Sequence, residues 1–268
     1  SFPFFDETKE LNENTRKEAA GSFIMLSDGV TQFELGGPKD GKPVVLVHGF
    51  SVPFFIFDSL FNFLAGAGFR VLRYDLLGRG YSDRPNTRYD IHLFVRQLKE
   101  LLDALDMNDI TLLGLSMGGP ITISFIDQHP RFVRKHVLID PAGAKNIGLG
   151  WLLQITRIPF VGELLIALFG SKNMIKSIAS DFFDPELVAA FQTKYKVQME
   201  YKGFKRAILS TMRNGMLDSF LETYKKAGAL KKPTLIFWGM NDETTPYKDH
   251  ALILQALPHA EFCAIENC

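Results

Sequence analysis

The chain has 268 residues, of which 46% are hydrophobic and 22% are charged, and its 30 basic and 30 acidic residues give a formal net charge of zero. This composition is typical of a soluble globular protein built as one large α/β domain, with or without an insertion, and it argues against a nucleic-acid partner. The two cysteines, Cys263 and Cys268, have neither the spacing of metal ligands nor that of a disulfide framework, and we expect neither a metal nor a cofactor.

The elements expected along the chain alternate between strands and helices. After a polar start over residues 1–20, short apolar runs bounded by turn residues predict strands at residues 23–26, 30–35, 44–47, 69–74, 110–113, 137–140, 234–238 and 261–265. Apolar residues at helical spacing predict helices at residues 57–67, 91–105, 187–196 and 247–257, and a further one between Gly118 and His129. This alternation favours an α/β fold in which a mostly parallel central sheet carries helices on both faces.

The alternation stops after Pro141 and returns only at residue 234. Residues 145–201 contain helical patterns and no predicted strand, so we expect them to form an all-helical insertion between two strands of one sheet. The remaining residues, 1–144 and 202–268, are expected to form the core domain.

The longest apolar region, residues 147–170, lies largely inside this insertion. Arg157, Pro159 and Glu163 interrupt it, and a membrane-spanning helix needs about 18 or more apolar residues in a row, so we do not expect it to cross a membrane. The region is more typical of a lid, or of a surface that touches lipid transiently. The sequence indicates neither the compartment nor the oligomeric state.

The sequence Gly114-Leu115-Ser116-Met117-Gly118 follows an apolar strand and precedes a helical pattern. Strand, sharp turn and helix are the context in which G-x-S-x-G forms a nucleophile elbow, with the serine hydroxyl exposed at a strained backbone position. The two glycines let strand and helix pass close together, and the helix directs its first free N–H groups toward a developing oxyanion. The alternative is a glycine-rich turn around an ordinary buried serine.

Four motifs, each directly after a predicted strand, carry a resemblance to a known family. They are His48-Gly49-Phe50, Asp75…Gly78-Arg79-Gly80-Tyr81-Ser82, Gly114-Leu115-Ser116-Met117-Gly118-Gly119 and Gly239-Met240-Asn241-Asp242…Pro246. In these motifs and in their order the chain resembles the α/β-hydrolase family, from about Phe23 to its last residue. The resemblance implies that the insertion is a helical cap between the strands that end near Asp140 and Trp238.

Carried over residue by residue, the resemblance implies that Ser116 is the nucleophile and that Gly114 and Gly118 support its turn. The backbone N–H groups of Phe50 and Met117 would form the oxyanion hole, which stabilises the negative charge of the tetrahedral intermediate. No residue is assigned to a metal.

The resemblance makes Asp242 the acid that orients the catalytic histidine. Two other interpretations stay open. Asp242 caps the helix that follows Pro246, or Asp140, which also ends a strand near the site, is the acid. His48 is expected to be structural and to pack beneath the oxyanion loop, and residues 78–82 to form a turn that supports the site.

The catalytic histidine does not occur at the expected place. In this fold the triad follows the order Ser, Asp, His, and only His250 and His259 come after Asp242. His250 lies within a predicted helix, and His259 precedes the last strand, which at about 3.3 Å per residue puts it roughly 15–20 Å from the edge that carries the site. The family's histidine comes just after this strand, so we expect it just beyond Cys268, and we expect the sequence without it to be an impaired enzyme.

A serine at position 116 separates the branches of the family. Epoxide hydrolases and haloalkane dehalogenases of this fold use an aspartate there, whereas a serine suits acyl transfer to water through an acyl-enzyme. The insertion is rich in Leu, Ile and Phe, and the chain has 24 phenylalanines. We therefore predict an esterase or lipase for a small hydrophobic acyl substrate, such as a monoacylglycerol. The competing interpretation is that these side chains only form the core between insertion and sheet.

Three alternatives to ester hydrolysis stay open. The first is a carbon–carbon bond hydrolase of the same fold, acting on a diketone-like substrate. The second is the perhydrolase activity of some serine members. The third is a non-catalytic binding module with an α/β-hydrolase-like fold, which the missing histidine favours and the intact elbow disfavours.

Overall fold

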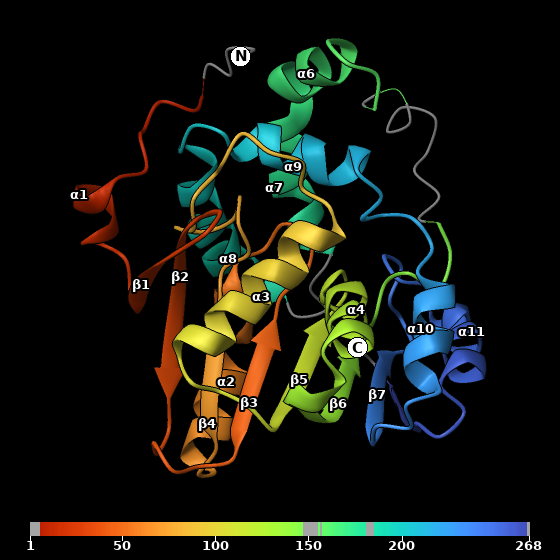
Figure 1. The fold of residues 1–268 in the computed structure, drawn as a ribbon. Coiled ribbons are helices and arrows are strands. Elements are labelled where there is room, and N and C mark those ends of the chain that lie inside the picture. Colours follow the sequence, from red (N-terminus) through yellow and green to blue (C-terminus); the bar gives the residue numbers. More distant parts are fainter. Residues whose placement is uncertain (1–5, 147–154, 156, 181–184, 267–268) are drawn as a thin grey trace.

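The centre of the molecule is one eight-stranded sheet (Figure 1). The computed structural model describes residues 6–146, 155, 157–180 and 185–266. Along the sheet the strands follow the order β1-β2-β4-β3-β5-β6-β7-β8, and β2 is antiparallel to β1 and β4 while the other neighbours are parallel. Their bounds are β1 (Ser22–Leu26), β2 (Gly29–Gly36), β3 (Pro43–Val47), β4 (Arg70–Tyr74), β5 (Ile110–Leu115), β6 (Val133–Ile139), β7 (Thr234–Gly239) and β8 (Glu261–Ile265).

Helices cover both faces of this sheet. α3, α4, α10 and α11 contribute side chains to the core cluster on one face, and α2 packs on the other face. Val45 and Val47 of β3 lie in the first cluster and Val44 and Leu46 in the second, as the alternation of side chains along a strand requires. The bounds are α1 (Glu13–Arg16), α2 (Asp58–Gly66), α3 (Ile91–Ala104), α4 (Gly118–Gln128), α10 (Leu221–Gly228) and α11 (His250–Ala256), with short 3₁₀ turns η1 (Phe54–Phe57), η2 (Pro130–Phe132) and η4 (Tyr247–Asp249). The predicted α/β fold with a mostly parallel central sheet is confirmed.

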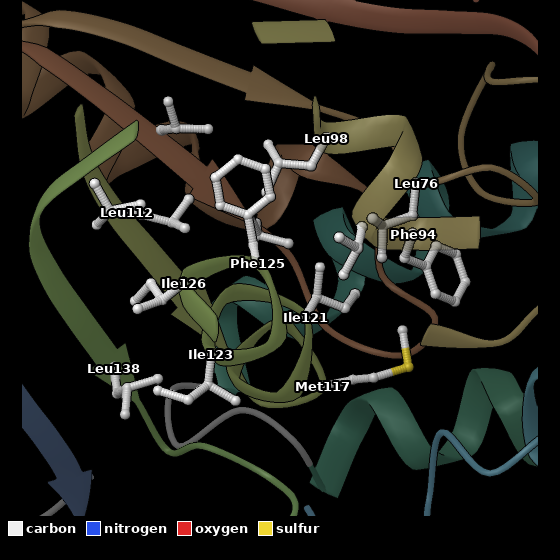
Figure 2. Close-up of a cluster of buried hydrophobic side chains, with 14 of the residues drawn as sticks. Leu76, Phe94, Leu98, Leu112, Met117, Ile121, Ile123, Phe125, Ile126 and Leu138 are labelled. Carbon is white, nitrogen blue, oxygen red and sulfur yellow. The ribbon is translucent and has the colours of Figure 1, made fainter. Parts of the chain in front are cut away.

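Helix α4 lies in the middle of the larger cluster. Its residues from Gly118 to Ile126 are all buried, and it packs against β5, α3 and α10. Figure 2 shows Ile121, Phe125 and Ile126 among apolar side chains of neighbouring elements. Each fully buried aliphatic or aromatic side chain stabilises the fold by about 1.5–3 kcal/mol. The helix that follows Ser116 is therefore held firmly against the sheet.

Between β6 and β7 the chain leaves the sheet and forms helices that lie, in Figure 1, above the arrowheads of β3 and β5. These inserted helices are α6 (Val161–Leu165), the π-helical turn η3 (Ile166–Gly170), α7 (Ser171–Ser180), α8 (Pro185–Met199) and α9 (Phe204–Arg213). Side chains from η3, α8 and α9 form a separate buried cluster, and Phe50, Val52 and Phe55 pack against it.

α9 and α10, which follow residue 201, are not among the helices predicted from the sequence. α9 contacts α6 and α8, whereas α10 packs against α4. The boundary drawn at residue 201 between the insertion and the core stays a prediction.

The apolar region at residues 147–170 is described only in part, because residues 147–154 and 156 lie outside the described part of the chain. Its later half contains α6 and η3. Over the ranges that the structure describes, no helix combines the length and the apolar composition needed to cross a bilayer.

The polar segment that precedes β1 lies against the inserted helices. The backbone of Lys9 pairs with Glu200 and Lys202, at 2.9 Å in both directions. The buried carboxylate of Glu7 accepts hydrogen bonds from the backbone N–H groups of Gly203 and Lys205, at 2.7 and 2.6 Å. This contact joins the start of the chain to the junction between α8 and α9.

Candidate active site

Ser116 occupies the turn between β5 and α4 and has a backbone that few residues other than glycine adopt. Its φ is +51°, in the left-handed region, and it is half-buried. Hydrogen bonds hold the turn on both sides: the Ser116 N–H donates to the Ile139 carbonyl at 3.0 Å, and the Ser116 carbonyl accepts from Gly119 and Ala142 at 2.8 and 3.0 Å. The neighbouring backbone therefore holds the strained conformation in place.

The glycines on either side of the serine have no room for a side chain. A Cβ on Gly114 would lie 2.5 Å from the Gly118 carbonyl oxygen, and a Cβ on Gly118 would lie 2.2 Å from the Val47 carbonyl oxygen. Strand, helix and the end of β3 are thus in backbone contact around Ser116. This is the packing that the sequence motif predicts for a nucleophile elbow.

The loop after β3 passes directly beside Ser116. A Cβ on Gly49 would lie 3.3 Å from the Ser116 Cβ and 3.6 Å from its Oγ. Phe50 follows at once and is half-buried, in contact with both the main core and the cluster of the inserted helices. The predicted oxyanion residue is therefore on a segment that runs beside the serine hydroxyl.

His48 lies beneath this loop with both ring nitrogens engaged. Its Nε2 accepts a hydrogen bond from the Leu76 N–H at 3.0 Å, so its Nδ1 carries the proton and donates to the Gly49 carbonyl at 2.9 Å. Burial lowers the pKa of His48 to about 3, and the ring is neutral near pH 7. His48 supports the loop as the sequence suggested and has no free nitrogen for proton transfer.

The two predicted oxyanion donors are backbone amides near Ser116. Met117 immediately precedes the first residue of α4 and has an α-helical backbone. Neither the Met117 N–H nor the Phe50 N–H donates a hydrogen bond to any residue in the described part of the chain. The arrangement suits a pair of donors for an external oxyanion, and this role stays a prediction.

Asp242 lies in the loop after β7, at the carboxyl edge of the sheet. Its Oδ1 accepts from the backbone N–H groups of Thr244 and Thr245, both at 2.7 Å, and its Oδ2 accepts from the Thr245 hydroxyl at 2.9 Å. A carboxylate offers about four acceptor positions, so these bonds leave room for one more donor. These bonds close the turn at Thr244 and Thr245, and Asp242 does not cap the helix after Pro246, because neither η4 nor α11 has a side-chain hydrogen bond at its start. The geometry fits the triad acid, a role that stays a prediction.

Asp140 occupies the adjacent strand end, after β6, and also has a left-handed backbone, with φ of +43°. Its Oδ1 accepts from the Gly239 N–H at 2.7 Å, and burial raises the pKa of Asp140 to about 6, with the charge of Asp242 adding to the shift. The Thr245 hydroxyl lies between the two loops, 3.2 Å from the Asp140 carbonyl oxygen. The structure thus brings the two candidate acids to one place, on either side of Thr245.

Neither histidine after Asp242 is placed to act as the base. His250 is stacked on Phe262, with ring centroids 4.8 Å apart, and its Nδ1 lies 2.6 Å from the Tyr247 carbonyl oxygen. The Nε2 of His259 lies 2.8 Å from the carbonyl oxygen of Lys232. Because Lys232 precedes β7 and Asp242 follows it, His259 is at the opposite edge of the sheet.

Two further polar side chains at this site were not found from the sequence. Arg79, in the loop after β4, is wholly buried and donates from Nε to the Phe50 carbonyl at 2.8 Å. Gln198 of α8 donates to the Ser51 carbonyl at 2.9 Å. The sequence predicted only a supporting turn at residues 78–82, since no local pattern shows which distant backbone a long polar side chain will reach.

Within the ranges that the structure describes, no group of three or more His, Cys, Asp or Glu side chains is arranged to hold a metal ion. The site groups shown here are a serine with a strained backbone and, after β6 and β7, two carboxylates.

Known proteins resemble this chain over nearly all of its length. The profile of the family described as alpha/beta hydrolase fold matches residues 42–268. The AB hydrolase superfamily protein YisY of Bacillus subtilis (strain 168) is 26% identical over 254 residues, which cover 92% of this chain and 91% of that protein.

A second relative and a solved structure carry more specific names. The 2-hydroxy-6-oxononadienedioate/2-hydroxy-6-oxononatrienedioate hydrolase of Klebsiella pneumoniae is 28% identical, over 96% of this chain and 92% of that protein. The structure of an esterase from Exiguobacterium antarcticum superposes with a TM-score of 0.75, at 23% identity, and covers 92% of this chain and 91% of that one. At this identity the structural likeness establishes the fold alone.

Proposed function

This chain belongs to the α/β-hydrolase fold family, and from that premise we propose that it is a serine hydrolase that cleaves hydrophobic carboxylic esters. The observation that carries the proposal is the backbone of Ser116, whose φ of +51° is held by neighbouring hydrogen bonds beside the Gly49–Phe50 segment. Strain of this kind in a packed turn is typical of a functional position.

In the proposed reaction the Ser116 Oγ attacks the ester carbonyl carbon while a base takes its proton. The backbone N–H groups of Phe50 and Met117 stabilise the oxyanion, and the base returns the proton to the departing alcohol. Water then attacks the acyl-enzyme, the base accepts the water proton, and Ser116 regains its own when the acid departs. Asp242 is the proposed partner of the protonated base, with Asp140 as its alternative.

The proposed base is a histidine beyond Cys268. The end of β8 supports this placement, because Ile265 pairs with Gly239 and its carbonyl accepts from the Met240 N–H at 2.9 Å. β8 therefore ends at the same edge of the sheet as β7, the edge that carries Asp242. His250 and His259 are engaged elsewhere and are not proposed for this role.

An apolar acyl group is the substrate that the surroundings of Phe50 favour. The cluster beneath the inserted helices consists of apolar and aromatic side chains, and Phe50 packs against it. The guanidinium of Arg79 is directed to protein acceptors, so it is not available to bind an anionic substrate. A neutral ester fits this environment better than a dianion does.

Carbon–carbon bond hydrolysis is the second candidate, because a relative named 2-hydroxy-6-oxononadienedioate/2-hydroxy-6-oxononatrienedioate hydrolase aligns with 96% of the chain. The two candidates differ in the charge of the substrate. We expect measurable turnover of neutral p-nitrophenyl esters and none of 2-hydroxy-6-oxo-dienedioates, and the reverse result would favour the second candidate.

The test of the proposed function is covalent labelling of the full natural chain with a fluorophosphonate. We expect one adduct, located on Ser116 by peptide mass spectrometry, together with ester turnover that Ser116→Ala abolishes. A full-length protein that is folded, takes up no label and hydrolyses no ester would contradict the proposal and favour a binding module.

Transient contact with lipid is proposed for the inserted helices. Ile158, Phe160, Leu164 and Leu168 are exposed by 51%, 82%, 48% and 61%, and all lie in or next to α6 and η3. We expect Phe160→Asp to reduce co-flotation with zwitterionic vesicles. Phe63→Asp is the matched control, because Phe63 is 71% exposed on α2. Equal flotation of the two variants and the wild type would contradict lipid contact at this surface.

A further inference from the structure

The segment that carries the Phe50 amide is held by a side chain that also reaches the inserted helices. Arg79 donates from Nε to the Phe50 carbonyl at 2.8 Å, from Nη1 to the Leu77 carbonyl at 3.3 Å and from Nη2 to the Thr211 hydroxyl at 2.9 Å. Thr211 belongs to α9 and is itself buried. One guanidinium therefore spans the oxyanion segment, the loop after β4 and an inserted helix.

A second side chain makes a parallel connection from α8. The amide nitrogen of Gln198 donates to the Ser51 carbonyl at 2.9 Å, and its amide oxygen accepts from the Gly80 N–H at 2.9 Å. Gln198 is buried. Consecutive carbonyls, those of Phe50 and Ser51, are thus each fixed by a donor from outside their own loop.

Because Arg79 and Gln198 are buried, their polar groups need hydrogen-bond partners within the protein. The exposed fraction of Arg79 is 0%, and within the described ranges it forms no ion pair with a carboxylate. Its charge is stabilised by the three acceptors named above, since a buried donor without a partner is costly. Burial lowers the pKa of Arg79 only to about 10, so the guanidinium is charged near neutral pH. Moving α9 would remove one acceptor and disturb the others.

The peptide planes explain why this bears on catalysis. The Phe50 N–H and the Phe50 carbonyl belong to successive peptide units that share one Cα. Fixing the carbonyl of Phe50 through Arg79 and that of Ser51 through Gln198 limits rotation about the backbone bonds of Phe50. The direction of the Phe50 N–H relative to Ser116 depends on those same bonds.

We propose that Thr211 and Gln198 of the inserted helices are positioning residues for the Phe50 amide, Thr211 acting through Arg79 and Gln198 through Ser51. The position of α8 and α9 then sets the oxyanion geometry, so that substrate contact with the inserted helices is transmitted to the reacting carbonyl. This inference rests on the proposed function for its catalytic consequence, but the positioning itself is a property of the folded chain.

The experiment uses Thr211→Val and Gln198→Met in the full natural chain. Thr193→Val is matched to the first, because both threonine hydroxyls donate to the carbonyl four residues earlier and Thr193 reaches no core loop. Gln192→Met is matched to the second, because Gln192 lies on the same helix and donates to Ile175 of α7. For a small ester such as p-nitrophenyl acetate we expect kcat to fall about 10-fold in each test variant, with KM within twofold of wild type.

Amide hydrogen exchange over residues 48–52 provides a readout that does not depend on turnover. We expect faster exchange there in Thr211→Val and Gln198→Met and wild-type exchange in the two controls. Unchanged kcat and unchanged exchange in the test variants would overturn the inference, as would losses of equal size in the controls. If the wild type takes up no serine-directed label, the proposed function fails, and the exchange measurement alone then decides whether Thr211 and Gln198 position this segment.

Discussion

The two ends of the candidate site are built by different means. At the end that contains Ser116, which we call the nucleophile end after its proposed role, Gly114 and Gly118 leave no space for a Cβ, and Ser116 has a left-handed backbone between them. At the other end, the acid end, which carries the two candidate acids, the carboxylates are held by hydrogen bonds, and both Asp140 and Asp242 accept such bonds. Backbone contact allows only one arrangement of the turn, so a short motif is enough to predict the conformation of Ser116. Hydrogen bonding admits two, so the motif leaves the acid open.

The largest expected effect separates the two acids. Asp242→Asn should lower kcat about 10⁴-fold if Asp242 orients the base, because an amide favours the wrong histidine tautomer. Asp140→Asn should then lower it less than about 10-fold. Steady-state kinetics of both variants in the full natural chain measure the difference, and the reverse order would make Asp140 the acid.

The second prediction concerns the backbone contacts at the nucleophile end. A Cβ on Gly118 would lie 2.2 Å from a backbone oxygen of β3, so Gly118→Ala should lower the free energy of unfolding by about 3 kcal/mol. Gly66→Ala is the control, because a Cβ there meets nothing within 4 Å and alanine is the better helix former by about 0.5–1 kcal/mol. Urea unfolding measures the stability of both variants and of the wild type. If Gly118→Ala were as stable as the wild type, the contact between β3 and α4 would be looser than the structure indicates.

The smallest expected effect is a pH dependence at the acid end. Burial raises the pKa of Asp140 from 3.8 to about 6, so between these values the folded chain binds more protons there than the unfolded chain. The free energy of unfolding therefore falls as pH rises through this window. Above about pH 6 the carboxyl is ionised in both states, and the free energy of unfolding falls no further on its account. Because solvent reaches the half-buried carboxyl, Asp140→Asn should add only about 1 kcal/mol at neutral pH and nothing near pH 4.

Unfolding curves of wild type and Asp140→Asn at the two pH values test this prediction. Asparagine tolerates the left-handed backbone of position 140, so the substitution changes charge with little strain. A stability difference that stays constant with pH would show that Asp140 does not titrate in this range.

The strand pattern of the sheet follows from local apolar runs, and this explains why the fold was predictable. β3, β4 and β7 match their predicted ranges to within a residue or so. β6 begins at Val133, earlier than predicted, because Arg134 and Lys135 break the apolar run. The backbone nevertheless pairs with β5 from Val133 onward, with a shift in register before Lys135. Sequence patterns detect buried side chains, not paired backbone.

The inserted helices were less predictable. α9 does carry a helical signal, since its buried side chains recur at Phe204, Ala207, Ile208, Thr211 and Met212. A threonine and charged neighbours dilute that signal. α10 is short and buries only Tyr224, Ala227 and Gly228, a set too small to show a period.

The positioning residues had no sequence signal at all. Gln198 and Gly80 are 118 residues apart, and Arg79 and Thr211 are 132 residues apart. Such pairs meet only because the insertion folds back over the carboxyl edge of the sheet. Which partner a long polar side chain binds depends on the tertiary structure, so it produces no periodic pattern in the sequence.

The contact between the start of the chain and the inserted helices has a practical consequence for spectroscopy. Because the backbone of Lys9 pairs with Glu200 and Lys202, a dye on the neighbouring exposed Thr8 will travel with the α8–α9 junction. Asn62 is exposed on α2, which is packed on the sheet. Energy transfer between dyes at these two positions would thus report any change in distance between the inserted helices and the sheet.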